Sequence, residues 1–335
     1  MTRSGFDPKS FYPALGLRST HTQSMISSSA YRRRIVNKRS RALLDAEQEW
    51  MVDGGDGVRL LGHHSAQAAH SKGLVILFHG WEGSSRSNYI VGLGGILYEQ
   101  GFDVFRLNFR DHGDSHQLNP GIFHSCRLDE IVHAVKDIQQ RLGAQNWVLC
   151  GYSLGGNFAL RVALKAPLAG LSISQVVAVS PVISPANTLK AMEDSPGGYE
   201  AYYIRKWAKS INRKQALFPD AYDYDEWYRL EGLREKTRFM ATHHYQFESL
   251  EQYFDGYSIA DKRLAALEIP ATILTSADDM VVPESDFTGL PENDTIELLV
   301  TRYGGHCAFL KNWKMECWAD DVIVERVLNS TGQPC

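Results

Sequence analysis

The chain has 335 residues, a hydrophobic fraction of 44%, a charged fraction of 22% and a formal net charge of −4. These values are typical of a globular protein with a sizeable core, and they exclude a disordered or fibrous chain. Because the overall balance is slightly acidic, no broad positive field would attract nucleic acid, and nucleic-acid binding is not expected.

Residues 1–50 are polar, basic and helical in character, and we predict that they form an extension that wraps the outside of the core. A basic run lies within this extension and contains Arg32, Arg33, Arg34, Lys38, Arg39 and Arg41. The simplest interpretation of the run is a solvated helical face. The alternative is peripheral contact with anionic lipid or with an acidic partner, because clustered cations attract such surfaces.

The sequence shows no segment typical of export or membrane insertion. Residues 1–20 lack the apolar core of a secretory signal. No apolar run approaches the roughly 20 residues that a membrane-spanning helix needs. The cysteines have no metal-ligand spacing, which favours reduced thiols; they are Cys126, Cys150, Cys307, Cys317 and Cys335. We therefore expect a cytoplasmic protein.

Short apolar runs along the rest of the chain indicate a sheet. A Gly/Asp cluster at 53–57, followed by Val58, predicts a hairpin at one edge of this sheet. The run 74–78 is continuously apolar, as in a parallel strand that is buried on both faces. Further strands are expected at 104–109, 147–150, 176–180, 271–275 and 296–300. Since helix-length segments separate most of them, we predict an α/β fold, with a mostly parallel central sheet and helices on both faces.

The succession of strands is interrupted between residues 184 and 269. This segment is rich in Tyr, Phe and Trp and shows no obvious strand. A structureless loop of this length is rare in a compact domain, so we expect a mostly helical cap or lid. The predicted organisation is the extension 1–50, a first part of the core at 51–183, the cap at 184–269 and a second part of the core at 270–335.

The segment 147–165 carries the strongest functional signal. The strand at 147–150 continues directly into GYSLG at 151–155, which matches the pattern GxSxG. A helix-compatible stretch follows at 156–165 and stops before Pro167. This context suits a nucleophilic serine, whose hydroxyl must be raised above the sheet on a tight turn. The flanking glycines remove Cβ atoms that would collide there. The pattern therefore predicts Ser153 as a nucleophile.

A serine nucleophile needs a base, and the base needs a group that orients it. His306 lies in a glycine-rich loop after the last strand, and no other histidine follows the candidate acids. Those acids, Asp278 and Asp279, come after the strand 271–275, at the sheet edge where ligand-binding loops gather. We favour Asp279, because its distance to Pro283 suits a turn that points the carboxylate inward. Asp278 is expected to form a cap or a salt bridge instead.

Two hydrogen-bond donors must also face the oxyanion of a tetrahedral intermediate. The backbone N–H of Leu154, directly after the nucleophile, is the first candidate. The second is the backbone N–H of Trp81, in the loop after the strand 74–78. We expect His79, in the same loop, to brace it rather than to act as a second base.

The sequence RDHGDS at 110–115 ends another strand and is expected to brace the rim of the same pocket. An alternative is a divalent cation held by side chains of this loop; the candidates are Asp111, His112, Asp114 and His116. The serine machinery explains the site without a metal ion, so neither a metal nor another cofactor is expected.

These motifs resemble those of the YheT-like branch of the α/β-hydrolases. The resemblance extends over nearly the whole chain and includes the stretch 11–23, HGWEGSS at 79–85, GYSLGGN at 151–157, the segment 247–257, ADDMVVP at 277–283 and GGHCAFL at 304–310. It implies the α/β-hydrolase fold with a helical insertion, and it assigns Ser153, Asp279 and His306 to a catalytic triad. The loop at 110–115 departs from the variants typical of this branch and is closer to the general hydrolase pattern.

The sequence therefore predicts a serine hydrolase, specifically a carboxylesterase that acts through an acyl-enzyme on small-molecule esters. An apolar acyl group is expected, because aromatic residues of the cap could cover its pocket; they are Tyr199, Tyr202, Tyr203, Trp207, Trp227 and Tyr228. Plain packing of these aromatic side chains is the alternative. Thioesterase, lipase, amidase or acyltransferase activity would use the same residues and stays open, as does a non-catalytic binding module on the same fold.

Overall fold

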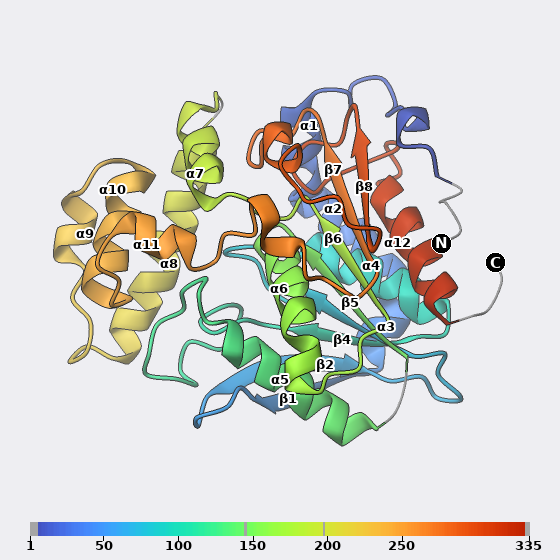
Figure 1. Ribbon diagram of the computed structural model, residues 1–335, viewed down its shortest axis with the longest axis horizontal. Coiled ribbons are helices and arrows are strands. Elements are labelled where there is room, and N and C mark those ends of the chain that lie inside the picture. The colour runs from blue at the N-terminus through green and yellow to red at the C-terminus, as the bar shows by residue number, and fades with distance from the viewer. Residues whose placement is uncertain (1–5, 144–145, 197, 332–335) are drawn as a thin grey trace.

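The computed structural model describes residues 6–143, 146–196 and 198–331 (Figure 1). Within these ranges, an eight-stranded sheet has the order β1-β2-β4-β3-β5-β6-β7-β8. β2 pairs antiparallel with β1 and with β4, whereas the remaining neighbours pair in parallel. The strands are β1 (Glu47–Asp53), β2 (Arg59–Ser65), β3 (Leu74–Phe78), β4 (Asp103–Leu107), β5 (Trp147–Tyr152), β6 (Gln175–Val179), β7 (Ala271–Ser276) and β8 (Ile296–Thr301). The predicted mostly parallel sheet is confirmed.

Helices lie before, between and after these strands. Those of the N-terminal extension and the core are α1 (Thr20–Ser27), α2 (Ala30–Arg39), α3 (Arg41–Asp45), α4 (Asn88–Glu99), α5 (Leu128–Leu142), α6 (Leu154–Ala169) and α12 (Trp318–Ser330). Between β6 and β7 come α7 (Pro185–Asp194), α8 (Tyr199–Leu217), α9 (Asp225–Arg229), α10 (Gly232–Phe239), the π-helical turn η2 (Met240–His244), α11 (Leu250–Asp255) and the 3-10 turn η3 (Asp261–Leu264). Two further 3-10 turns are η1 (Pro8–Ser10) and η4 (Glu284–Phe287).

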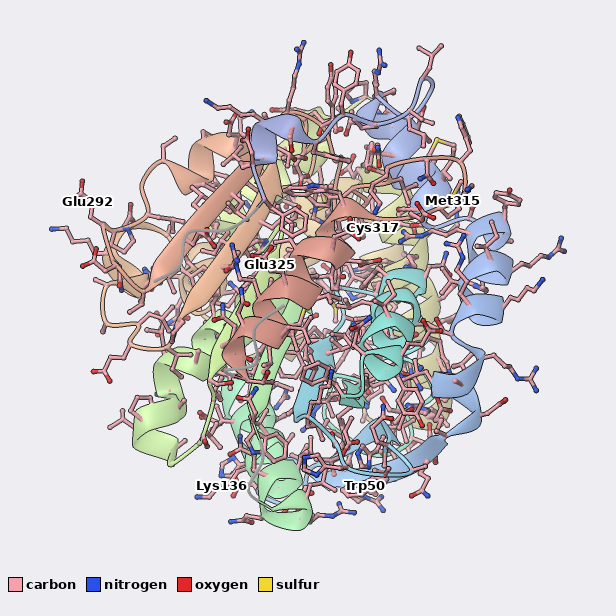
Figure 2. The ribbon with its side chains drawn as sticks, turned by 90° about the vertical axis from the view of Figure 1, so that its right-hand side faces the viewer. Trp50, Lys136, Glu292, Met315, Cys317 and Glu325 are labelled. Carbon is pink, nitrogen blue, oxygen red and sulfur yellow. The ribbon has the colours of Figure 1, made fainter. Side chains whose placement is uncertain are left out.

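The central strands form because alternate side chains enter two apolar layers. In β3, Leu74, Ile76 and Phe78 face the layer that α5 and α6 complete. Val75 and Leu77 face the opposite layer, with α4 and α12. Figure 2 views this second layer, where α12 lies beside α4 and the N-terminal helices lie beyond α4. Since both faces are covered, the strands read as continuous apolar runs in the sequence.

Several element boundaries differ from the prediction. The strand expected at 104–109 ends at Leu107, and the strand expected at 147–150 continues to Tyr152. The helix expected to stop before Pro167 continues to Ala169 and ends at Gly170, whose φ of 67° is left-handed. Pro167 lies in the last turn of this helix, so its missing N–H removes only one late hydrogen bond. The burial of Ala163 and Ala166 holds this turn in place.

The segment 184–269 forms a group of helices at one end of the core (left in Figure 1). Neither 184–196 nor 198–269 contains a strand, as expected for a helical cap. Aromatic packing joins its helices: the rings of Trp207 in α8 and Trp227 in α9 meet edge to face at 5.3 Å. We call this segment the cap.

The N-terminal extension, as far as the structure describes it from residue 6, contains η1 and α1 to α3. β1 begins at Glu47, so the sheet starts four residues before the predicted boundary at 51. The predicted hairpin forms, with Asp53 opposite Arg59. The basic run is not uniformly solvated: Arg32 is 2% exposed, and its Nη1 donates to the carbonyl of Ser27 at 3.4 Å. The other members of the run are exposed.

None of the helices in the described ranges has both the length and the apolar character required to cross a bilayer. A cytoplasmic location stays a prediction.

Candidate active site

Ser153 occupies a strained turn between β5 and α6. Its φ of 53° and ψ of −120° raise the side chain above the sheet, and its N–H donates to the carbonyl of Val179 at 2.8 Å. The turn has no room for a Cβ atom two residues before or two residues after Ser153. A Cβ at Gly151 would lie 2.1 Å from the carbonyl oxygen of Gly155, and a Cβ at Gly155 would lie 2.4 Å from that of Phe78. The two glycines of the pattern are therefore steric requirements of this turn.

The structure brings Ser153, His306 and Asp279 together in one line of hydrogen bonds. The Oγ of Ser153 lies 3.0 Å from Nε2 of His306. The Nδ1 of His306 lies 2.9 Å from Oδ2 and 3.1 Å from Oδ1 of Asp279. With Nδ1–H donated to the carboxylate, the lone pair of Nε2 faces the serine hydroxyl, as a general base requires.

Asp279 is fixed at the start of the loop that follows β7. Its side chain is 0% exposed. Its Oδ1 also accepts the backbone N–H groups of Val281 at 2.8 Å and Val282 at 3.0 Å. Burial is the largest single influence and lowers the pKa of His306, but the Asp279 carboxylate and the neighbouring Cys307 together raise it, and the pKa lies well above the usual 6.5. The site therefore stabilises an imidazolium.

Asp278, the second candidate acid, points to a different partner. Its Oδ1 accepts the backbone N–H of Gly305 at 2.9 Å. Ser276 donates its hydroxyl to the carbonyl of the same glycine at 3.1 Å. The side chain of Asp278 thus binds the backbone of the loop that carries His306, and it does not bond to the imidazole.

The N-terminal extension also holds the loop of His306, which the sequence did not reveal. Ser24 Oγ accepts the backbone N–H of His306 at 3.3 Å. Gln23 is 0% exposed and bonds both polar groups of the Leu310 backbone: Nε2 donates to the carbonyl at 3.0 Å, and Oε1 accepts the N–H at 2.8 Å. Nε2 of Gln23 also donates to the carbonyl of Leu17 at 2.7 Å. Gln23 and Ser24 therefore position the loop of the candidate base.

The two candidate oxyanion donors lie beside Ser153. Leu154 opens α6, so its N–H has no partner in the helix. In the part of the chain that the structure describes, the N–H of Trp81 donates to no protein acceptor. Gly80, just before Trp81, lies so close to the elbow that an added Cβ would stand 3.2 Å from the Cβ of Ser153. Both donors are thus available at the nucleophile.

Three side chains fix the loop that carries Trp81. His79 is 0% exposed; its Nδ1 donates to the carbonyl of Gly80 at 2.8 Å, and its Nε2 accepts the N–H of Phe109 at 3.2 Å. The hydroxyl of Tyr89 accepts the N–H of Gly80 at 3.0 Å. His79 therefore has the bonds of a bracing residue.

His112 is the third of these side chains. Its Nδ1 donates to the carbonyl of Arg110 at 2.8 Å, and its Nε2 accepts the N–H of Glu82 at 3.2 Å. Burial lowers its pKa to about 4, so the imidazole is neutral and Nε2 can accept. His112 thus joins the loop after β4 to the residue that follows Trp81.

The other side chains of the loop 110–116 that could have held a cation make separate contacts. Asp111 Oδ1 accepts from Nζ of Lys214 at 2.8 Å. Asp114 pairs with Arg213 at 3.1 Å, and His116 meets the hydroxyl of Ser210 at 2.9 Å. All three partners belong to α8, so this loop contacts the cap.

An apolar pocket of about 80 Å³ opens at Ser153, between the core and the cap. Of the six aromatic residues singled out in the cap, Tyr203 and Trp207 line this pocket, together with aliphatic side chains such as Leu189 and Met192. The other four do not line it; Tyr202 and Tyr228, for example, are exposed. The expectation that all six cover the pocket is therefore too broad.

Four cysteines are free thiols, and Cys335 lies outside the described residues. Cys307 is nearest to the site, with Sγ 3.8 Å from Nε2 of His306.

Comparison with known proteins identifies relatives of this chain. A family described as the alpha/beta hydrolase fold matches residues 73–312. The putative esterase YheT of Escherichia coli is 25% identical over 308 residues, which cover 90% of this chain and 87% of YheT. Phospholipase ABHD3 of Mus musculus is 21% identical over 274 residues, covering 78% of this chain and 64% of ABHD3. The chain thus spans less than two thirds of the ABHD3 protein.

Solved structures share the fold at low identity. A membrane phospholipase A described as a bacterial virulence factor has a TM-score of 0.57 at 15% identity, and the match covers 93% of both chains. The esterase Pf2001 of Pyrococcus furiosus has a TM-score of 0.55 at 16% identity, with 84% of this chain and 91% of Pf2001 covered.

Proposed function

Since the chain belongs to the α/β-hydrolase fold family, in its YheT-like branch, we propose that it is a serine hydrolase that cleaves carboxylic esters through an acyl-enzyme. The observation that carries the proposal is the unbroken line of hydrogen bonds from Ser153 through His306 to the buried Asp279. The esterase and phospholipase names of the relatives agree with ester substrates.

In the first half of the reaction, Nε2 of His306 takes the proton of the Ser153 hydroxyl as Oγ attacks the ester carbonyl. The negative charge that develops on the carbonyl oxygen is held by the N–H groups of Leu154 and Trp81. Asp279 stabilises the imidazolium and keeps its Nδ1–H in place. His306 then returns the proton to the alcohol as the carbon–oxygen bond breaks, leaving the acyl group on Ser153.

In the second half, His306 takes a proton from water, which attacks the acyl carbonyl. His306 then gives this proton to Oγ of Ser153 as the acyl–oxygen bond breaks, which releases the acid and restores the serine hydroxyl. The apolar pocket between core and cap is the place for the acyl group, because the side chains that line it are mostly aliphatic and aromatic. Its volume of about 80 Å³ favours short acyl chains unless the cap moves.

The proposal is tested with a fluorophosphonate probe, which labels activated serines, and with p-nitrophenyl esters of increasing acyl length. Wild type is expected to label and to hydrolyse the esters, Ser153→Ala to do neither, and His306→Ala to label far more slowly. Ser172→Ala, at an exposed serine, is the matched control and should behave as wild type. Wild type that neither labels nor turns over any ester would contradict the proposal and favour a binding module.

A further inference from the structure

A second cavity, of about 500 Å³, lies next to the candidate active site. Its walls come from α2, from the loops 82–87 and 111–116, and from α8 of the cap. A small void of about 10 Å³ shares Trp81 and Trp207 with the apolar pocket, and it shares Glu82 and Ser210 with the large cavity. The three spaces therefore follow one another past Trp81, and the large cavity begins one residue from a proposed oxyanion donor.

The charges that line this cavity are mostly positive. Its basic residues are Arg33, Arg86, Lys206, Lys209 and Arg213, and its acidic residues are Glu82 and Asp111. The charge of Asp111 is matched by Lys214, at 2.8 Å. Arg86 and Arg213 also have carboxylate partners, in Glu47 and Asp114.

Three cations remain without such a partner. Within the described ranges, no carboxylate oxygen lies within 4.0 Å of the side-chain nitrogens of Arg33, Lys206 or Lys209. Cations that share one concave wall without counter-ions repel one another, and an anion bound among them removes that repulsion. The basic run of the extension thus contributes Arg33 to a cavity beside the site.

The neutral and acidic groups of the wall do not offset this charge. Burial raises the pKa of Glu82 to about 7, although Lys206 lowers it, so the carboxyl is only partly ionised at neutral pH. Burial lowers the pKa of His112 to about 4 and that of His116 to about 3, so both imidazoles are neutral. Ser87 lines the cavity at the N-terminus of α4, where the helix carries partial positive charge.

The helix that carries the two lysines is fixed relative to the reacting centre. Lys206 and Lys209 follow Tyr203 by three and six positions along α8, so one face of this helix presents all three. The ring of Tyr203 stacks on that of Trp81, at 5.4 Å and an interplanar angle of 11°. The stack ties the face with the lysines to the loop that carries the oxyanion donor.

We propose that this cavity, which we call the cationic cavity, binds a phosphate group on the leaving-group side of the ester, with Lys206 and Lys209 as its main charges and Arg33 at its outer wall. The assignment rests on the proposed function. A phosphate fits because its several oxygens can accept from ammonium groups, a guanidinium and hydroxyls such as that of Ser87 at once. The acyl group would lie in the apolar pocket, on the other side of Trp81.

The test compares two short-chain esters that differ only in the phosphate: 1-butanoylglycerol and 1-butanoylglycerol 3-phosphate, at one ionic strength, because salt screens charges. The measured quantity is the ratio of kcat/KM for the phosphorylated ester to that for the neutral one. The variant is Lys206→Gln with Lys209→Gln. The matched control is Lys136→Gln with Lys165→Gln, two exposed lysines on α5 and α6; Lys136 lies at the bottom of Figure 2.

Wild type and the control are expected to prefer the phosphorylated ester, and the ratio should fall about tenfold in the Lys206/Lys209 variant. A second arm measures whether glycerol 3-phosphate or inorganic phosphate raises the Tm of wild type more than that of the variant. If only this second arm responds, the cavity binds phosphate from a free metabolite, and the leaving-group assignment is wrong. An unchanged ratio together with no shift in Tm overturns the proposal.

Failure of the proposed function can be told apart from failure of the cationic cavity. Calorimetry of phosphate and glycerol 3-phosphate with the Ser153→Ala protein measures the cavity without hydrolysis. Binding there by a protein whose wild type hydrolyses neither ester would uphold a phosphate site and reject the esterase. Hydrolysis of both esters at equal rates without any phosphate binding would uphold the esterase and reject the phosphate site.

Discussion

The two nitrogens of the neutral His112 imidazole form different hydrogen bonds, so substitutions of His112 can test whether it positions the loop that carries Trp81. Nε2 accepts the N–H of Glu82, next to Trp81, whereas Nδ1 donates to the carbonyl of Arg110 in its own loop. Three substitutions separate these bonds. His112→Leu removes both, His112→Gln keeps an acceptor near the place of Nε2, and His112→Asn keeps a donor near the place of Nδ1.

The size of the effect has an upper limit. Loss of an entire oxyanion donor lowers kcat by about 10²–10³-fold, and His112→Leu leaves the N–H of Trp81 present but less well aimed. We therefore expect kcat to fall by about 10- to 100-fold, with little change in KM, since the loop acts on the transition state. Each lost hydrogen bond should also reduce the free energy of unfolding by about 1 kcal/mol, and buried groups left unpaired should add about 1–3 kcal/mol.

The assay measures kcat and KM on one p-nitrophenyl ester and the free energy of unfolding in urea for all three variants. We expect His112→Gln to retain more kcat than His112→Asn, although both lose similar stability. Wild-type kcat in His112→Asn would refute the positioning role. If kcat falls in proportion to the free energy of unfolding across the three variants, His112 contributes to packing alone and does not position the loop.

Three further predictions concern the acid, the elbow and the extension. In wild type, kcat/KM should fall as the pH drops through the raised pKa of His306. Asp279→Asn removes a charge that raises this pKa, so the acid limb of the pH profile should move to lower pH. The same variant should lower kcat by about 10⁴-fold. Gly155→Ala should prevent folding, as judged by circular dichroism, because its Cβ would stand 2.4 Å from a backbone oxygen; Gly289→Ala, with nothing within 4 Å, should fold normally. Gln23→Met keeps the side-chain volume but loses three buried hydrogen bonds. Urea denaturation should therefore show a free energy of unfolding that is lower by about 3 kcal/mol, and fluorophosphonate labelling should slow. Met25→Ala, at a position that is 73% exposed, should change neither quantity.

The sequence was most informative where local chemistry alone decides the structure. β3 has the predicted bounds, because a short run that is apolar at every position and is closely followed by a glycine is typical of a strand buried on both faces. The strained turn at Ser153 needs glycines at fixed spacing, so the pattern and the geometry agree. Chain order selected His306, and the distance to Pro283 then favoured Asp279 over Asp278; the structure brings His306 and Asp279 together.

The contacts that depend on distant parts of the chain could not be predicted. The segment 11–23 was noticed only as a resemblance, and nothing local indicates that Gln23 bonds the backbone of Leu310. Arg32 was grouped with its solvated neighbours, because composition does not tell which side of a helix faces the core. Likewise, no pattern within the cap distinguishes Tyr203, which lines the apolar pocket, from the exposed Tyr202. Packing of one element on another decides these cases.

The bonds of Gln23 and Ser24 to the loop of His306 have a consequence for the order in which the protein matures. They join positions 287 and 282 residues apart, so α1 emerges from the ribosome long before its partners exist. A nascent chain can complete the turn at Ser153 while the imidazole that would activate it is still unsynthesised. Contacts of such long range also form late in folding, because the entropy of closing a large loop must be overcome first. Covalent labelling of Ser153 should therefore become fast only after Gln23 and Ser24 have reached the loop of His306, so its rate follows a late step of folding.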